Sequence, residues 1–277
     1  MSNKLKDILK GKLTQKELEM IPSSFDIVGN ILIFSYFPDK LTKKEKIIGN
    51  TILKNHKHIK SIFKKTKKHS GRYRIPKLEL LAGENKKETE HKENNVRLKL
   101  DVEKVYFSSR LSTERKRIFQ QIRKNESVLV MFSGAATYPI VISKNTKAKE
   151  IYGIEINPIA HKYALENLRL NKSEDRIKLF LGDVKNSLSK INKKFDRILM
   201  PLPKGAKNYL DIALNKIKKK GIIHFYTFSE ENKYDNIKKS IKKECEKQKK
   251  KCRLLRVTKC GQYSPRVFRI CVDFEVN

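Results

Sequence analysis

A turn of small residues near the middle of the chain is the first candidate for chemistry. Residues 128–132 are apolar, residues 133–136 read Ser-Gly-Ala-Ala, and residues 137–142 are again mostly apolar. Glycine and alanine let a ligand come close to the backbone, because they carry little or no side chain. The pattern predicts a strand that runs into a ligand-binding turn, although Gly134 alone is weak evidence for one.

Acidic residues stand at the ends of the next two apolar segments. Glu155 follows the turn by about twenty residues, the spacing at which a carboxylate holds ribose hydroxyls in nucleotide-binding sheets. Asp183 ends the segment LFLGD, where it would contact an adenine amine or the neighbouring backbone. Residues 200–203 read Met-Pro-Leu-Pro, which predicts a rigid lip with few free N–H groups.

The order of these features favours one cofactor. Neither the dinucleotide fingerprint GxGxxG nor the phosphate-binding loop GxxxxGKS/T occurs in the chain. In a doubly wound sheet, ligands bind at the carboxyl ends of the strands, where the strand order reverses. A small-residue turn followed by two acidic strand ends fits S-adenosylmethionine. The competing interpretation is a parallel sheet with incidental acids, which for Glu155 alone is equally good.

Strand-like and helix-like segments alternate from Ser112 onward, which predicts a parallel sheet with crossover helices. The predicted strands are residues 127–132, 150–156, 177–183, 195–203 and 222–228. The predicted helices are residues 160–172 and 208–219, and the predicted edge hairpin is 253–276. Up to Ser109, mixed short segments predict a small α+β domain. We therefore predict an α/β fold with domains at 1–109 and 110–277.

The charge of the chain indicates a polyanionic partner. Its 277 residues include 64 Lys and Arg against 30 Asp and Glu, a formal net charge of +34 that is spread along the chain. Nucleic acid is the partner that such an excess favours first. The alternative is a lysine-rich genome or a hot habitat, but these usually raise the number of acidic residues as well.

Membrane and metal-binding classes are disfavoured by the sequence. No apolar run reaches the ~18 residues of a membrane span, and the N-terminus has no signal-peptide core. We therefore expect no membrane partner and a cytoplasmic location. The four cysteines have no paired spacing, so we expect reduced thiols and no metal site.

Motifs spread along nearly the whole chain form a specific set. They are IPSSFDIVGNILI, GRYRIPKLELLAGE, VYFSSRLSTERKRI, MFSGAATYPIVI, IEINPIAHKYALENLRLNK, DRILMPLPKGAKNYLDIALNKIKKKGIIHFYTF and YSPRVFRICVDFEV. Together they resemble the archaeal tRNA (guanine-37-N1)-methyltransferases. The resemblance implies a Rossmann-like class I methyltransferase domain, S-adenosylmethionine as cofactor, and tRNA as partner, with the α+β domain helping to grip the anticodon stem-loop. We also expect a monomer, in a form that lacks the family's N-terminal elbow-binding domain.

The resemblance also assigns catalytic roles. Methylating N1 of guanine removes its proton, so a base must lie within hydrogen-bond reach and a cation must stabilise O6. Glu114 is similar to the family's general base, and Arg74 and Arg110 are similar to the arginines that hold guanine and phosphate. Tyr106 is expected near the base, and Tyr138 as a wall of the substrate pocket. Two alternatives stay open: Glu114 as a helix cap, and both arginines as phosphate clamps.

The expected cofactor-binding residues follow the strand ends. They are Phe132, Gly134, Ala135, Glu155, Ile156, Asn157, Asp183, Val184, Pro201, Leu202 and Pro203. The chain departs from the family at Val130, where Asp is common, and at Pro201, where Asn is common. In the tail, Tyr263, Arg266 and Arg269 are either ligands or a simple alternation of core and surface.

Other functions remain open beside guanosine-37 methylation. One is the wybutosine-pathway transferase, which moves the aminocarboxypropyl group of S-adenosylmethionine, and another is methylation of a tricyclic base at the same tRNA position. A third is a basic RNA-binding module without catalysis. Val130 and Pro201 slightly favour the module, whereas the retained Glu114, Glu155 and Asp183 favour an enzyme.

Overall fold

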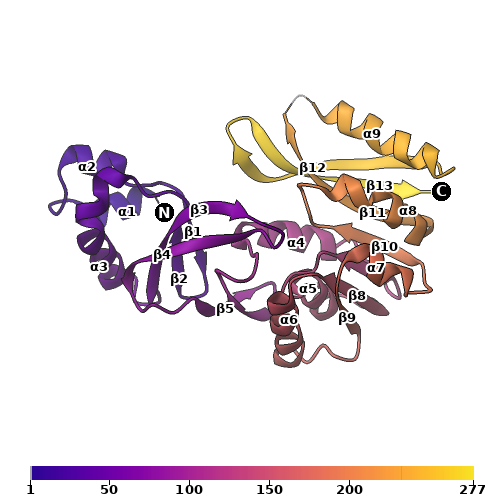
Figure 1. Cartoon of the computed structure of the whole chain (residues 1–277), viewed down its shortest axis with the longest axis horizontal. Coiled ribbons are helices and arrows are strands. Elements are labelled where there is room, and N and C mark those ends of the chain that lie inside the picture. Colours follow the sequence, from indigo (N-terminus) through magenta and orange to yellow (C-terminus); the bar gives the residue numbers. More distant parts are fainter. Residues whose placement is uncertain (1, 232) are drawn as a thin grey trace. The chain divides into compact units, whose positions relative to one another are not determined.

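The computed structural model describes residues 2–231 and 233–277, drawn as a ribbon in Figure 1. The chain divides into two compact units. The N-terminal unit is Met1–Glu93 with Arg97–Arg110, and the C-terminal unit is Asn94–Val96 with Leu111–Asn277.

The N-terminal unit consists of helices packed on a four-stranded sheet, with a separate two-stranded ribbon formed by β5 and β6. The sheet order is β1-β2-β3-β4, with β2 and β3 parallel and the other pairs antiparallel. The strands are β1 (Phe25–Val28), β2 (Ile31–Phe34), β3 (Ser61–Ser70), β4 (Ile75–Gly83), β5 (Glu88–Glu93) and β6 (Val96–Asp101). The helices are α1 (Ser2–Leu9), α2 (Gln15–Met20), the 3-10 turn η1 (Asp39–Lys44) and α3 (Glu45–Asn55).

The C-terminal unit is built on a seven-stranded sheet in the order β12-β13-β11-β10-β7-β8-β9. Its strands are β7 (Ser127–Met131), β8 (Glu150–Glu155), β9 (Ile177–Leu181), β10 (Phe195–Met200), β11 (Ile217–Glu230), β12 (Cys252–Ser264) and β13 (Val267–Val276). Strands β7 to β11 are parallel, and β13 is antiparallel to both β11 and β12. The strand order reverses between β7 and β10, which is where such sheets bind ligands. The predicted α/β fold is confirmed.

Helices cover both faces of this sheet, which explains why all five residues of β7 are buried and four of them, residues 128–131, are apolar. They are α4 (Ser112–Phe119), α5 (Thr137–Asn145), α6 (Pro158–Leu170), α7 (Val184–Ser189), α8 (Leu210–Lys216) and α9 (Tyr234–Lys247), with 3-10 turns η2 (Ser109–Leu111) and η3 (Ala206–Tyr209). On one face, Met131 and Ile198 of the sheet belong to the same buried cluster as Leu214 of α8 and Ile241 of α9. Helices α5 and α6 contact β8 and β9.

The sequence located these elements, but several ends differ. The predicted strand 195–203 ends at Met200, since Pro201 and Pro203 have no N–H to donate to a neighbouring strand. The predicted helix 208–219 begins as η3 and ends at Lys216, because Ile217 is buried and pairs with Phe195 in the sheet. The predicted strand 222–228 is the middle of the longer β11. The predicted edge hairpin is confirmed as β12 and β13. The domain division at residue 109 stays a proposal.

A buried arginine connects three parts of the sheet unit. Arg197 of β10 is 1% exposed, and its Nε and Nη2 donate to the two carboxylate oxygens of Glu126 at 2.7 and 3.0 Å. Nη2 also donates to the backbone oxygen of Gln121 at 2.8 Å, and Nη1 lies 2.8 Å from Nε2 of His224 in β11. Removing one partner of such a pair leaves a buried charge without compensation.

We predict that Arg197→Met lowers the free energy of unfolding by about 3–5 kcal/mol, because it leaves the Glu126 carboxylate, only 13% exposed, without its cation. Lys218→Met is the matched control, since Lys218 pairs with the neighbouring Asp196 at 2.9 Å but is 46% exposed. Exposed pairs contribute about 0–1 kcal/mol. Urea unfolding of both variants measures the difference, and equal losses would show that the Arg197 contacts add nothing special.

Candidate functional site

The turn after β7 adopts an unusual backbone. Phe132, Gly134 and Ala136 all have positive φ angles, of 64°, 58° and 59°. For Phe132 and Ala136 this conformation is strained, and such strain concentrates at ligand-binding sites. The backbone N–H of Ser133 donates to the carbonyl of Ile154 at 2.8 Å, which holds the turn against the end of β8.

Glu155, at the end of β8, ties this turn to the next one. Its Oε2 accepts from the backbone N–H of Gly134 at 2.7 Å, and its Oε1 accepts from that of Asn157 at 2.8 Å. Burial raises the pKa of Glu155, and the backbone donors Asn157, Gly134 and Ile156 oppose that rise. Each carboxylate oxygen has a second lone pair that can accept from a ribose hydroxyl.

The next residues form the start of α6, which fixes the loop after Glu155. Asn157 is the N-cap, and its side-chain oxygen accepts from the N–H groups of Ile159 and Ala160 at 3.0 and 3.4 Å. Pro158 occupies the first helical position, where its missing N–H costs nothing. The sequence EINP therefore sets both the acid and the helix that follows it.

Asp183 and the Met-Pro-Leu-Pro segment follow β9 and β10. Asp183 caps α7, its Oδ1 accepting from the N–H of Lys185 at 2.9 Å, while Val184 is buried. The N–H of Gly182 donates to the carbonyl of Glu155 at 2.8 Å, so the ends of β8 and β9 are joined. After β10, the N–H of Leu202 donates back to Met200 at 2.7 Å in a tight turn.

The structure thus brings Gly134, Glu155 and Asn157 into direct contact. The other predicted cofactor residues stand at the ends of the same four parallel strands: Phe132, Ala135, Ile156, Asp183, Val184, Pro201, Leu202 and Pro203. Their individual contacts with a cofactor stay predictions.

The turn at residues 133–136 and the part of β8 beneath it fit S-adenosylmethionine in two respects. Ser133 Oγ is buried and has no hydrogen-bond partner among the described residues. A Cβ on Gly153 would lie 3.1 Å from that oxygen and 2.7 Å from Leu179, so only glycine lets the turn lie this close to β8. A fixed carboxylate for the ribose and a turn of small residues are the groups that this cofactor requires.

Glu114 lies in a separate cluster on α4. It is 5% exposed, and Arg117 donates to both of its oxygens, from Nε to Oε2 and from Nη2 to Oε1, each at 2.7 Å. The hydroxyl of Tyr226 donates to Oε1 at 2.7 Å. The helix-cap alternative for Glu114 is wrong, because Leu111 is the N-cap and no side chain caps this helix. Glu114 is instead one half of a buried, bidentate ion pair.

This ion pair continues into the sheet. Arg117 also donates from Nη1 and Nη2 to the two oxygens of Asp273, at 2.5 and 3.3 Å. Asp273 Oδ1 lies 2.6 Å from Nδ1 of His224, whose Nε2 faces the Arg197 guanidinium. We call Glu114, Arg117, Asp273, His224 and Arg197 the buried polar chain.

The buried polar chain fixes the protonation of His224. A guanidinium can only donate, so Nε2 of His224 must accept, and its proton must sit on Nδ1, facing Asp273. The imidazole is therefore neutral. Burial lowers the pKa of His224, Asp273 opposes this, and the charges of Arg197 and Arg117 lower it further. Burial raises the pKa of Asp273, but His224 and Arg117 hold it below its usual value overall.

Most residues of the buried polar chain were not predicted from the sequence, although the sequence contains a signal for them. His224 and Tyr226 alternate with apolar residues in a strand, and Asp273 interrupts an apolar strand in the tail. Polar side chains in such strands are buried only when they have partners. His224, Cys271 and Asp273 also have potential ligand atoms within 4.8 Å of one another. Two guanidinium groups already bond to this group, which disfavours a metal ion there.

Tyr138 belongs to the same buried region. It is 5% exposed, and its hydroxyl lies 3.1 Å from that of Tyr226. Burial raises its pKa, and the nearby charge of Glu114 adds to the effect. Its expected role as a pocket wall stays a prediction, and in this structure it supports the hydroxyl that binds Glu114.

Arg74, Tyr106 and Arg110 lie in the N-terminal unit, so the predicted catalytic set is divided between the units. Arg110 donates from Nε to Asp26 Oδ1 at 2.5 Å and from Nη2 to Ser24 Oγ at 3.0 Å. Arg74 is half-buried in the turn between β3 and β4, with φ of 52°, and Tyr106 is half-buried shortly before η2.

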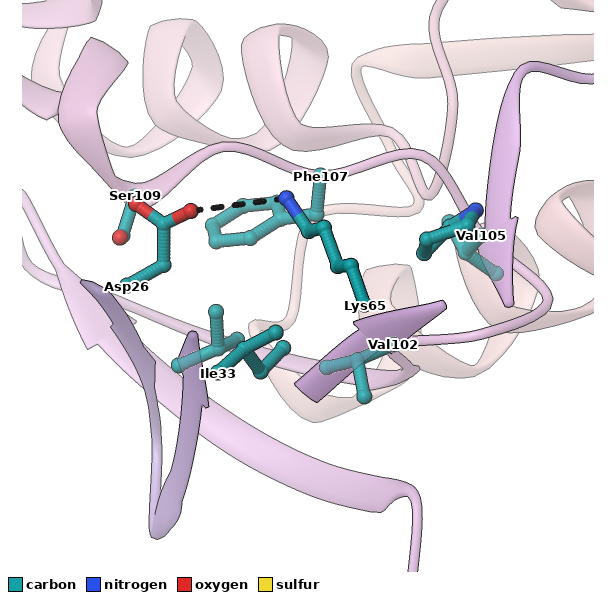
Figure 2. A pocket seen from close by; sticks show the side chains of 9 residues that line it. Asp26, Ile33, Lys65, Val102, Val105, Phe107 and Ser109 are labelled. Carbon is teal, nitrogen blue, oxygen red and sulfur yellow. Dashed lines mark ion pairs between the residues drawn. The ribbon is translucent and has the colours of Figure 1, made fainter. Parts of the chain in front are cut away.

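A small pocket in the N-terminal unit surrounds the partner of Arg110. Figure 2 shows Asp26 and Lys65 pointing toward each other over an apolar lining that includes Ile33 and Phe107, with Lys65 Nζ 3.8 Å from Asp26 Oδ2. Burial lowers the pKa of Lys65, Asp26 opposes this, and Arg110 adds to the lowering. Asp26 thus holds two cations at the unit's surface.

The neutral state of His224 predicts how stability depends on pH. In the unfolded chain His224 takes up a proton below about pH 6.5, whereas the folded chain resists it. The free energy of unfolding should therefore fall as pH falls below about 6.5, by up to about 1.4 kcal/mol per pH unit from this residue.

His224→Asn keeps a donor for Asp273 and an acceptor for Arg197 but cannot titrate, so it should flatten the dependence. His161→Asn is the control. Burial also lowers the pKa of His161, but its side chain is only half-buried, so this variant should change the pH dependence less than His224→Asn does. Denaturant unfolding between pH 5 and 8 tests this, and an unchanged slope in His224→Asn would refute it.

Comparison with known proteins adds to the geometry. No helix within residues 2–231 and 233–277 is long and apolar enough to cross a membrane. The model of the TRM5/TYW2 methyltransferase domain matches residues 89–255, and that of the TYW2 N-terminal domain matches residues 5–86.

Individual relatives match most of the chain. The tRNA (guanine(37)-N(1))-methyltransferase Trm5b of Pyrococcus abyssi is 40% identical over 95% of this chain and 78% of its own length, and a crystal structure of it matches with a TM-score of 0.86. The tRNA (guanine(37)-N(1))/4-demethylwyosine(37)-methyltransferase Taw22 of Nanoarchaeum equitans is 37% identical over 79% of this chain and 88% of its own length.

A third relative was solved with a fragment of the cofactor. The structure of Pyrococcus horikoshii TYW2 in complex with MeSAdo is 25% identical in sequence to this chain and has a TM-score of 0.82. The match covers 100% of this chain and 99% of the TYW2 chain. The strand order, the fixed acid at the end of β8 and these matches agree, and the chain belongs to the TRM5/TYW2 family of S-adenosylmethionine-dependent methyltransferases.

Proposed function

We propose that this chain methylates N1 of guanosine 37 in the anticodon loop of tRNA. The observation that carries the proposal is the buried carboxylate of Glu114, held by Arg117 and Tyr226 in the same unit as the cofactor turn. The relative from Pyrococcus abyssi is named for this reaction. The net charge of +34 supports a polyanionic substrate.

Glu114 has the chemistry of a general base. N1 of guanine must lose its proton as the methyl group arrives, and a carboxylate within hydrogen-bond reach can accept it. Three donor contacts from Arg117 and Tyr226 leave about one of its four acceptor positions. The nearby thiol of Cys260 donates to the backbone oxygen of Thr258 at 3.4 Å, and burial and the charge of Glu114 raise the pKa of that thiol. A substrate N–H can take the remaining acceptor position on Glu114.

The contacts of Glu114 fix its orientation. Arg117 divides its donors between Glu114 and Asp273, so it ties the carboxylate to β13. Tyr226 adds a single neutral donor from β11. The carboxylate is thereby held in one orientation, as proton transfer to a positioned base requires.

S-adenosylmethionine supplies the methyl group from its sulfonium centre. The protein would hold it at the carboxyl ends of the strands, with Glu155 accepting from the ribose hydroxyls. The backbone of the turn around Gly134 would lie against the cofactor. Phe132, whose ring is 5.0 Å from that of Tyr209, offers an apolar side to this site.

The arginines of the N-terminal unit would act on the RNA. Arg74 and Arg110 are proposed to hold the target guanine and its phosphate, and to stabilise charge on O6. Arg110 is bound to Asp26, so this role requires the substrate to compete with that carboxylate. Tyr106 would pack near the target base.

A second candidate reaction uses the same sites. The N-terminal part of the chain matches the TYW2 N-terminal domain, and the TYW2 structure is covered over 99% of its length. These observations favour aminocarboxypropyl transfer, or methylation of 4-demethylwyosine as in the name of Taw22. Pro201, where asparagine is common among guanosine-37 methyltransferases, is consistent with either.

Nucleoside mass spectrometry after incubation with tRNA and S-adenosylmethionine distinguishes these products. We predict N1-methylguanosine at position 37 from unmodified tRNA, and a fall of about 10²–10⁴-fold in rate for Glu114→Gln, the range of general base catalysis. Glu246→Gln on the exposed side of α9 is the isosteric control and should keep the full rate.

The alternative outcomes are separate. An aminocarboxypropyl adduct, or product only from tRNA carrying 4-demethylwyosine, would replace the main proposal with the second candidate. Full activity of Glu114→Gln would remove Glu114 from the role of base. Thermal unfolding and S-adenosylmethionine binding of the variant check that it is folded.

A further inference from the structure

The face of the sheet that carries the buried polar chain continues to an exposed aromatic pair. His224, Tyr226 and Phe228 alternate along β11, so they share one face. Their partners on β13 are Asp273, Cys271 and Arg269. The first two pairs are buried, whereas Phe228 and Arg269 are only half-buried.

Phe228 packs against a tyrosine from the edge hairpin in a tilted ring pair. The ring centroids of Phe228 and Tyr263 are 4.1 Å apart at an interplanar angle of 33°. The guanidinium of Arg269 lies 5.8 Å from the centre of the Phe228 ring. Tyr263 is 65% exposed, so much of its surface is open to solvent. We call Phe228 and Tyr263 the aromatic platform.

An exposed tyrosine in this position is not required by the core. β12 and β13 shift register between Gln262 and Ser264, so Tyr263 stands at an irregularity of the ladder. Register irregularities re-aim side chains and are frequent beside active sites. Gly261, with a φ of +140° and nothing within 4 Å of an added Cβ, leaves open space next to Arg269.

The charges around the platform are positive in sum. The cations are Lys233, Lys259, Arg266 and Arg269, and the acids are Glu230 and Glu231. Glu230 pairs with Lys233, and Glu231 pairs with Lys259. The four cations outnumber the two acids, and Arg266 is exposed. Aromatic rings with arginines beside them are the combination that binds single-stranded nucleic acid.

The aromatic platform is also close to Glu114, the proposed general base. Tyr226, whose hydroxyl binds Glu114, is two residues from Phe228 on the same strand face. Two residues of a strand span about 7 Å. A ring on the platform is therefore a near neighbour of the site where the proton of the target base is removed.

We propose that the aromatic platform stacks an unpaired nucleobase next to the base that is modified, with Arg266 and Arg269 facing its phosphate. The proposal rests on the proposed function, in that the chain acts on an RNA loop. A target base must leave its stack to be methylated, and its neighbour then loses a stacking partner. The platform replaces that partner and fixes the loop for the reaction.

The chain offers a direct probe, because it contains no tryptophan. In Tyr263→Trp the single tryptophan reports only on the platform, and a base stacked on it quenches its fluorescence. Leu165→Trp is the control, since Leu165 is 41% exposed and lies on α6 of the same unit, with no proposed RNA contact. An unmodified anticodon stem-loop RNA is added until binding is complete. Fluorescence anisotropy of a labelled copy of the RNA monitors this binding.

The proposal predicts that bound RNA quenches Tyr263→Trp but not Leu165→Trp. A stem-loop that lacks the base on one side of position 37 should abolish the quenching, which identifies the stacked neighbour. Tyr263→Ala should bind the intact stem-loop roughly 5- to 150-fold more weakly, the range for loss of one base–aromatic stack, and Tyr263→Phe should bind normally.

The contrary results are distinct from failure of the proposed function. Unchanged fluorescence of Tyr263→Trp in the RNA-bound state, or equal affinity of Tyr263→Ala, would overturn the platform even while wild-type protein forms N1-methylguanosine. Quenching that persists with either flanking base removed would also overturn it. Absence of RNA binding by the wild type would remove both proposals together.

Discussion

A carboxylate that must stay charged inside a protein constrains everything around it. Glu114 is buried, and burial of an isolated charge is too costly unless it is paired and fully hydrogen-bonded. Its partner Arg117 is shared with Asp273, Asp273 is shared with His224, and His224 meets Arg197. Carboxylates and guanidinium groups thus alternate, with one neutral imidazole between them, and no charge in the chain stands alone.

The buried polar chain draws its residues from several elements of the C-terminal unit. Glu114 comes from α4, Asp273 from β13 and His224 from β11, and the antiparallel pairing of β11 with β13 puts these side chains in one row. Arg197 extends the row to β10, next to the strand-order reversal where β7 begins the cofactor turn. The strand residues that anchor the proposed general base, Glu114 of α4, and the strand that carries the cofactor turn therefore belong to one sheet.

The sequence was sufficient for the parts that depend on local pattern. The strand periodicity, the small-residue turn, Glu155 at a strand end and the Asn-Pro start of α6 are all short-range signals, and the structure has each of them. The buried polar chain depends on register between segments far apart: His224 and Asp273 are 49 residues apart, and Arg117 and Asp273 are 156 apart. No local rule gives those pairs, although polar residues in buried strands could have indicated that partners were required.

The same reason applies to the residues whose surroundings differed from expectation. Nothing near Arg110 in the sequence indicates that Asp26, 84 residues earlier, takes its guanidinium. Tyr138 was expected on a pocket wall from its place after the turn, but its partner is Tyr226, on a strand 88 residues away. Family resemblance drew attention to Glu114, whose role stays a prediction, while the bidentate pair that holds it became visible only through the fold.

The orientation of the Glu114 carboxylate is the point on which the proposed proton transfer depends, and the single-turnover rate of methyl transfer by Tyr226→Phe measures its importance. Loss of the hydroxyl removes one of the three donor contacts that hold this carboxylate. We expect a slower transfer step with unchanged binding of S-adenosylmethionine and tRNA, because a base must lie in the correct position to accept the proton. A transfer rate equal to that of the wild type would show that Glu114 and its buried partners do not control the reacting proton.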